Sequence, residues 1–255
     1  NAIAEGRSDA FKRHFLGTHF FNPPRHLKLL EIIPGAHTDP ALVQFMAHFT
    51  TEILGKGVVI CKDTPNFIAN RFISIAGGFG MNYAYDHGYT VEEIDMLTGP
   101  LIGRPKSGTF RLADVVGVDV LAYVAQNLHP AIPNDPQREV LRHIGIMRFT
   151  EFLMQNNFLG DKTGQGFFKK VERDGQREFW ALNLRTLEYE APQKVRFESV
   201  DKHRKNPNTG ARIKALIAET DRAGVYLWHL HAFYLSYAAT MLGEIADDIS
   251  SIDNA

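Results

Sequence analysis

Residues 15–33 read FLGTHFFNPPRHLKLLEII, and this stretch decides the fold class. It holds two short apolar runs, residues 15–21 and 27–33, which are rich in aromatic or β-branched side chains and are bounded by proline or glycine. Such runs favour buried strands. A helix starting at Thr38-Asp39-Pro40 and a third strand at residues 58–61 follow. Strand, strand, helix and strand predict the C-terminal part of an open α/β sheet.

The next stretch is predicted to be mainly helical. Thr64-Pro65 is typical of a helix start, and the helix is expected to run to Tyr85. Thr90 and Glu93 have the spacing of a capping box, which predicts a second helix immediately afterwards.

Two later segments break the helical pattern. Asp174-Gly175 lies between two strand-like runs and predicts a small β-hairpin. Residues 192–209 are charged and poor in large apolar side chains, so they are interpreted as a linker or a solvated surface. Helices are expected again over residues 210–246. The predicted fold class is therefore an α/β remnant followed by mainly helical domains with a hairpin insertion.

Composition excludes several classes of function. The formal net charge of the 255 residues is −1, so nucleic acid and anionic membranes are not expected as partners. No apolar run reaches the roughly 18 residues that a membrane span needs. The single cysteine excludes a disulfide framework and fits a reducing compartment, which predicts a cytoplasmic protein. No histidine set has metal-ligand spacing, so no metal site is predicted.

A weak internal repeat sets residues 67–95 against residues 225–253. Ile94-Asp95 and Ile252-Asp253 end the two copies, and Trp228 falls at the position of Asn70. The chain begins with Asn1 and stops in a helix-like stretch at Ala255. We therefore expect both ends to be cut from a longer polypeptide, with a partial second helical copy at the C-terminal end.

His19 and Glu31 lie on the two predicted strands. A period of two places Glu31 on one face with Leu27, Leu29 and Ile33, where a buried carboxylate needs a partner. A histidine on the neighbouring strand would be that partner, and the pair would act as a base and its orienting group. The plainer interpretation is a satisfied core histidine and a strand-edge glutamate, and spacing alone favours it.

Asn70 lies early in the predicted helix, where an amide can point into a cleft; an exposed or capping asparagine is the plainer interpretation. No G-x-G-x-x-G occurs at a strand-to-helix turn. By residue pattern alone, nothing in this chain therefore indicates a dinucleotide.

Two motifs carry a resemblance to a known family. They are Gly17-Thr18-His19-Phe20-Phe21-Asn22-Pro23-Pro24 with Lys28-Leu29-Leu30-Glu31-Ile32-Ile33, and Asp63-Thr64-Pro65-Asn66-Phe67-Ile68-Ala69-Asn70-Arg71. Together they resemble the NAD-dependent L-3-hydroxyacyl-CoA dehydrogenases over roughly residues 1–170. Thr98-Gly99-Pro100-Leu101-Ile102-Gly103-Arg104-Pro105-Lys106 and the helical copy after residue 210 resemble the bacterial proteins that fuse this enzyme to an enoyl-CoA hydratase.

The resemblance implies a function and a set of site residues. His19 would be the catalytic base, Glu31 would orient it, Asn70 would bind the 3-oxygen of the substrate, and Asn22 would support the same pocket. The implied reaction is oxidation of L-3-hydroxyacyl-CoA to 3-oxoacyl-CoA with NAD in fatty acid β-oxidation. The implied partners are an acyl-CoA substrate and either a second copy of the chain or a fused enoyl-CoA hydratase domain.

The resemblance also implies four segments. Residues 1–62 would be the C-terminal part of a Rossmann domain, 63–170 a helical dehydrogenase domain, 171–209 a hairpin and linker, and 210–255 a partial second helical domain. The family's glycine-rich turn would lie upstream of Asn1, so the NAD-binding residues are unknown. This chain alone is expected neither to hold NAD nor to be active.

Two alternatives stay open at this point. The chain could be a non-catalytic helical interaction or scaffold module of a multifunctional β-oxidation protein. A hydroxyacid dehydrogenase of another kind would place a catalytic lysine on the helix that carries Asn70, and no lysine lies between Asp63 and Leu97. The distance between His19 and Glu31, and their access to a cleft with Asn70, separates catalysis from scaffolding.

Overall fold

The computed structural model describes residues 1–173 and 175–255. These residues form two compact units, unit 1 with residues 1–73 and 235–255, and unit 2 with residues 74–234. The helices α3 (Ala69–His87) and α10 (Arg222–Met241) each contribute residues to both units. The division into four segments predicted from the sequence follows other boundaries and stays a prediction.

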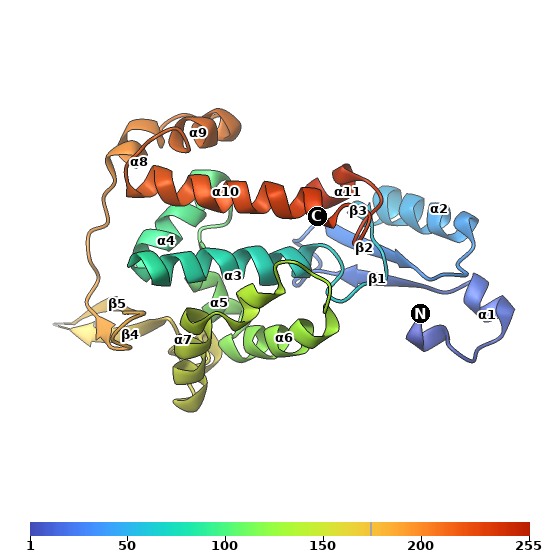
Figure 1. Cartoon of the computed structure of the whole chain (residues 1–255), viewed down its shortest axis with the longest axis horizontal. Helices are drawn as coiled ribbons and strands as arrows, with labels where there is room; N and C mark the ends of the chain where they lie inside the picture. The colour runs from blue at the N-terminus through green and yellow to red at the C-terminus, as the bar shows by residue number, and fades with distance from the viewer. Residues whose placement is uncertain (174) are drawn as a thin grey trace. The chain divides into compact units, whose positions relative to one another are not determined.

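Unit 1 is built on a three-stranded sheet with β2 (Leu29–Pro34) in the middle. β1 (Leu16–Phe20) pairs with β2 antiparallel, and β3 (Gly57–Ile60) pairs with it parallel (Figure 1). The three predicted strands are confirmed, with ends that differ by one or two residues. Four consecutive residues of β2, numbers 30–33, are buried, as expected for a central strand covered on both faces.

The helix α2 (Pro40–His48) connects β2 to β3 and packs against the sheet (Figure 1). Its predicted start is confirmed, because the Asp39 carboxylate accepts a hydrogen bond of 3.0 Å from the Ala41 amide and Pro40 occupies the first turn. A π-helical turn, η2 (Phe49–Ile53), follows directly. Two short helices, η1 (Ala2–Ala4) and α1 (Asp9–Arg13), precede β1.

Unit 2 is mainly helical. The predicted capping box is confirmed at α4 (Val91–Thr98), where Thr90 and Glu93 exchange side chain to backbone hydrogen bonds. The helices α3 and α10 meet where the Tyr226 hydroxyl donates to the Gly80 carbonyl at 3.4 Å. The other helical elements are η3 (Pro100–Ile102), α5 (Phe110–Val116), α6 (Val118–Ala131), η4 (Arg138–Arg142), α7 (Ile144–Gln155), η5 (Asp161–Thr163), α8 (Glu198–His203) and α9 (Thr209–Leu216).

The hairpin region pairs β4 (Phe168–Arg173) with β5 (Gln176–Leu182) antiparallel, and β5 also pairs with the short β6 (Tyr189–Glu190). Asp174 of the predicted turn lies outside the described residues. The interpretation of residues 192–209 as a linker or solvated surface is wrong in its middle. This segment contains α8, and Phe197 and Val200 are buried in the core of the unit.

The weak sequence repeat has a structural counterpart in its last turn. Asp248 begins α11 (Ile249–Asp253) by accepting from the Ser251 amide, as Thr90 accepts from the Glu93 amide at the start of α4. The alignment that sets Ile94 against Ile252 also sets Thr90 against Asp248 and Glu93 against Ser251. Both isoleucines are buried. The two copies therefore share a cap and a buried anchor.

Candidate active site

The strands β1 and β2 bring His19 and Glu31 together. The antiparallel register sets these two residues directly opposite each other, so their side chains leave the same face of the sheet. His19 Nδ1 lies 2.6 Å from Glu31 Oε2. The predicted pairing of the histidine with the buried carboxylate is therefore present in the structure.

Glu31 is completely buried, and its carboxylate has three hydrogen-bond donors. Besides His19, the amides of Ile68 and Ala69 donate to Oε1 at 3.0 and 2.9 Å. These amides lie at the N-terminal end of α3, where unpaired N–H groups and the helix dipole favour a negative charge. The helix start thus offsets the cost of burying a carboxylate in the sheet.

The contact with Glu31 leaves the outer nitrogen of His19 available. A carboxylate accepts hydrogen bonds, so the proton lies on Nδ1 and Nε2 carries the lone pair when the ring is neutral. The His19 side chain is 29% exposed, and no described residue is bonded to Nε2. This arrangement can accept a proton from a bound molecule and stabilise the resulting imidazolium.

Two aromatic rings pack near the imidazole of His19. The ring of Phe21 lies 4.6 Å from that of His19, between centroids, and the ring of Phe67 lies 5.6 Å away. Phe67 and Asn66 both have positive φ angles, of 50° and 64°. Sequence reasoning missed both rings, since nothing in the spacing of Phe21 or Phe67 relates them to His19.

The predicted start of the helix at Pro65 is wrong. α3 begins at Ala69, and residues 65–68 form a turn. Left-handed backbone at Asn66 and Phe67 prevents a helix there, and it turns the amides of Ile68 and Ala69 toward Glu31. The one available signal was Asn66, because asparagine adopts the left-handed region more readily than most residues.

The two predicted asparagines are placed differently. Asn70 lies in the first turn of α3, half-buried, next to the Ala69 amide that binds Glu31. Asn22 is exposed on the segment after β1, in a cis peptide bond with Pro23. No hydrogen bond of the described part of the chain connects the Asn22 side chain to His19 or Glu31. The structure therefore brings together His19, Glu31 and the start of α3, which carries Asn70, whereas Asn22 is exposed and takes no part in these hydrogen bonds.

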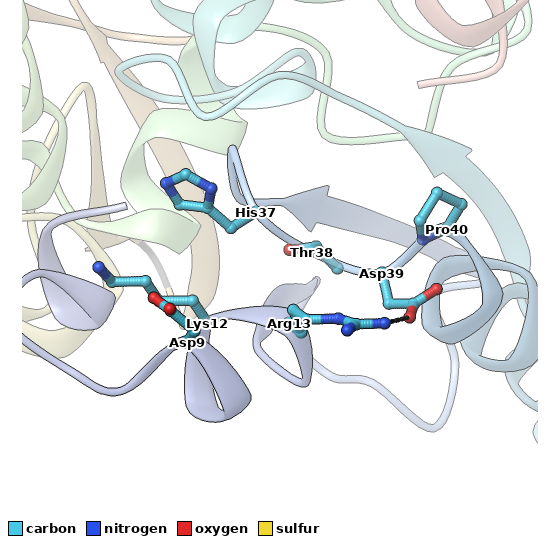
Figure 2. A pocket seen from close by; sticks show the side chains of 7 residues that line it. All are labelled: Asp9, Lys12, Arg13, His37, Thr38, Asp39 and Pro40. Carbon is cyan, nitrogen blue, oxygen red and sulfur yellow. Dashed lines mark hydrogen bonds and ion pairs between the residues drawn. The ribbon is translucent and has the colours of Figure 1, made fainter.

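A separate hollow of unit 1 is drawn in Figure 2. Its lining residues are Asp9, Lys12, Arg13, His37, Thr38, Asp39 and Pro40. Arg13 and Asp39 form an ion pair of 2.9 Å within it, so its charges are partly matched. None of the predicted site residues lines this hollow. We therefore place the candidate site at the paired His19 and Glu31, and not in this hollow.

The surroundings of the pair also affect the single cysteine. Burial, followed by the charges of Glu31 and Asp63, raises the pKa of Cys61 to about 12. Cys61 is therefore a thiol at neutral pH and is no nucleophile. Residues 1–173 and 175–255 contain no group of three histidine, cysteine, aspartate or glutamate side chains placed to bind a metal ion, and none of their helices meets the length and hydropathy that crossing a bilayer requires.

Comparison with known proteins adds the family. Residues 1–64 match the model of the 3-hydroxyacyl-CoA dehydrogenase NAD binding domain, and residues 67–170 match that of the 3-hydroxyacyl-CoA dehydrogenase C-terminal domain. The chain belongs to the 3-hydroxyacyl-CoA dehydrogenase family. The predicted fold class, a Rossmann-type part followed by the helical domain of these dehydrogenases, is confirmed by the same matches.

Two relatives match almost the whole length of this chain. A Bacillus subtilis protein described as a probable 3-hydroxyacyl-CoA dehydrogenase is 48% identical over 99% of the chain. A Rickettsia felis protein with the provisional name of a fatty acid oxidation complex trifunctional enzyme is 27% identical over 99% of the chain. The chain spans 31% and 33% of the lengths of these two proteins.

A solved structure is similar as well. The (S)-3-hydroxybutyryl-CoA dehydrogenase of Ralstonia eutropha is 26% identical, with a TM-score of 0.53, over 65% of this chain and 54% of that one.

Proposed function

We propose that this chain contributes the catalytic pair of an NAD-dependent dehydrogenase that oxidises L-3-hydroxyacyl-CoA to 3-oxoacyl-CoA in fatty acid β-oxidation. The observation that carries the proposal is the buried Glu31, which holds Nδ1 of His19 at 2.6 Å while no described residue is bonded to Nε2. A base with this geometry suits removal of a hydroxyl proton.

Residues of this chain perform the proton transfer and position the substrate. Nε2 of His19 takes the proton of the 3-hydroxyl as the C3–O bond becomes a carbonyl. Glu31 stabilises the imidazolium that forms and keeps the ring in place. Asn70 binds the 3-oxygen, and Asn22 supports the acyl-CoA at the edge of the same pocket. NAD, when bound, supplies the acceptor for the hydride that leaves C3.

The residues of the chain fit the part of the proposed reaction that takes place at the 3-hydroxyl of the substrate. The partly exposed imidazole of His19, which packs near two aromatic rings, offers the base that hydride transfer from an alcohol requires. The G-x-G-x-x-G turn that binds dinucleotide phosphates does not occur in the sequence, so no residue is assigned to the phosphates of NAD.

The wider context is part of the same proposal. The trifunctional name of the Rickettsia felis relative supports fusion to an enoyl-CoA hydratase in a bacterial multifunctional protein. A homodimer is the alternative arrangement. We also propose a cytoplasmic location, which the single cysteine supports.

The test compares the turnover of a CoA ester with the turnover of the corresponding free acid. The natural full-length protein that contains these residues would be assayed with NAD and L-3-hydroxybutyryl-CoA, and with free L-3-hydroxybutyrate as the control. Oxidation of the CoA ester alone is the expected result. No turnover of either compound would refute the proposal and favour the scaffold module.

A further inference from the structure

Arg71 is a buried cation on the turn that carries the site. It is 2% exposed, one position after Asn70 in the first turns of α3. Its Nη1 donates to the Pro65 carbonyl at 3.0 Å, and its backbone amide donates to the Asn66 carbonyl at 3.2 Å. The same residue thus binds two consecutive carbonyls of the turn that precedes α3.

That turn holds a conformation which its residues do not favour on their own. Asn66 and Phe67 are consecutive left-handed residues, and a bulky side chain rarely adopts such a backbone. Conformations of this kind persist where neighbouring groups impose them. The two hydrogen bonds from Arg71 lie at the start and middle of the turn, so they are suited to impose it.

The turn reaches His19 by two routes. The Phe67 ring lies against the imidazole, and the amides of Ile68 and Ala69 fix the carboxylate that holds Nδ1. A shift of the turn would therefore move the imidazole through Phe67 and through Glu31 at the same time.

Arg71 is itself held by the C-terminal part of unit 1. Nε of Arg71 lies 3.1 Å from the hydroxyl of Tyr237, which accepts the hydrogen bond. Tyr237 is 2% exposed, and its ring packs edge-on against Phe72 at 5.1 Å. Tyr237 lies beyond residues 67–170, the part that matches the family's C-terminal domain.

We propose that Arg71 and Tyr237 are positioning residues for the catalytic histidine. Tyr237 orients the guanidinium, Arg71 holds the turn of residues 65–68, and the turn sets the position of His19. The proposal rests on the function proposed above for His19. If the proposal is correct, Tyr237, in the C-terminal part of the chain, helps to position the base of the dehydrogenase reaction.

The Tyr237 hydroxyl can be removed without detaching the C-terminal segment. Lys62 holds that segment separately, because its backbone amide donates to the Ile245 carbonyl at 2.9 Å and its Nζ donates to the Gly243 carbonyl at 2.6 Å. Nζ also forms an ion pair of 2.7 Å with Asp247. Tyr237→Phe keeps the ring against Phe72 and removes the hydroxyl that accepts the hydrogen bond from Arg71.

Tyr226→Phe is the matched control. Tyr226 lies on the same helix, is 0% exposed, and donates its hydroxyl hydrogen bond to Gly80 in unit 2. Both variants of the natural full-length protein would be compared with wild type by kcat and KM for acetoacetyl-CoA reduction with NADH. Independently of activity, the ring signals of ¹³C-labelled histidine would be recorded, with His19 assigned through His19→Gln.

A displacement of about 1 Å in a catalytic group costs roughly 10²-fold in rate, so partial loosening is expected to lower kcat about tenfold. The expected result is this loss in Tyr237→Phe, with KM within about twofold and a shifted His19 signal, and no change in Tyr226→Phe. An unmoved His19 signal in Tyr237→Phe, or an equal shift in Tyr226→Phe, would overturn the proposal. If the wild type shows no turnover, the proposed function fails, whereas the histidine signals still decide whether Tyr237 positions His19.

Discussion

Glu31→Gln separates the catalytic part of Glu31 from its structural part. The substitution keeps the shape of the side chain but replaces one acceptor oxygen by an NH₂ donor. The amides of Ile68 and Ala69 can only donate, so the remaining oxygen of the glutamine must face them. The NH₂ group then faces Nδ1 of His19, which must become an acceptor, and the proton moves to Nε2.

The size of the effect follows from these contacts. A proton on Nε2 blocks the nitrogen that takes up the substrate proton, and reversal of a catalytic tautomer by a carboxylate-to-amide change costs about 10⁴-fold in a serine protease. We expect kcat to fall by roughly 10²–10⁴-fold. The two amide hydrogen bonds survive, and the hydrogen bond with His19 loses only the contribution of the charged carboxylate. The free energy of unfolding should therefore change by about 1 kcal/mol.

Glu31→Ala is the matched comparison. It leaves both amides without a partner in a site that is 0% exposed, at about 1–3 kcal/mol each, and thus roughly 2–6 kcal/mol in total. The assays are NADH oxidation with acetoacetyl-CoA and urea unfolding of the three proteins. Wild-type turnover in Glu31→Gln would refute the reasoning, as would equal unfolding free energies of the Gln and Ala variants.

Three further predictions concern other groups. Asn70→Ala should lower kcat about 10²-fold by removing a donor to the developing oxyanion, and a change in KM alone, seen in steady-state kinetics, would contradict this role. Cys61, whose burial raises its pKa to about 12, should resist iodoacetamide at pH 8 in the folded protein and react in urea; mass spectrometry that finds rapid labelling of the native state would speak against it. Burial raises the pKa of Asp114 to about 6, against the hydrogen bonds from the Phe167 and Phe168 amides. The folded state then holds a proton that the unfolded state has already released, so the unfolding free energy should fall from pH 4 to pH 6. Urea titrations should find this fall smaller in Asp114→Asn; an identical slope would refute the assignment.

The sequence contained enough information for the paired strands and for the hypothesis of a contact between His19 and Glu31, although spacing alone favoured the plainer interpretation. Two short apolar runs with period two fix the faces of neighbouring strands, and a carboxylate on a buried face requires a donor. The helix start was predicted wrongly because local rules favour Thr64-Pro65. The observed start depends on Glu31, which is distant in sequence and takes the Ile68 and Ala69 amides.

The other failures have the same physical origin. Helix α8 has six residues, mostly polar, and its order depends on the burial of Phe197 and Val200 in the core of unit 2. The rings of Phe21 and Phe67 and the hydrogen bonds of Arg71 are tertiary contacts as well. The local sequence pattern indicates which face of a helix or strand is apolar. It does not indicate which residues, distant in the sequence, that face contacts.

The most direct test of the account is the turnover of His19→Gln in the natural full-length protein, with His26→Gln as the control. His26 is exposed and lies on the same segment, between β1 and β2. If His19 is the base held by Glu31, kcat for acetoacetyl-CoA reduction should fall by about 10²–10⁴-fold in His19→Gln and stay within about twofold in His26→Gln. Turnover of His19→Gln at the wild-type rate would contradict the account.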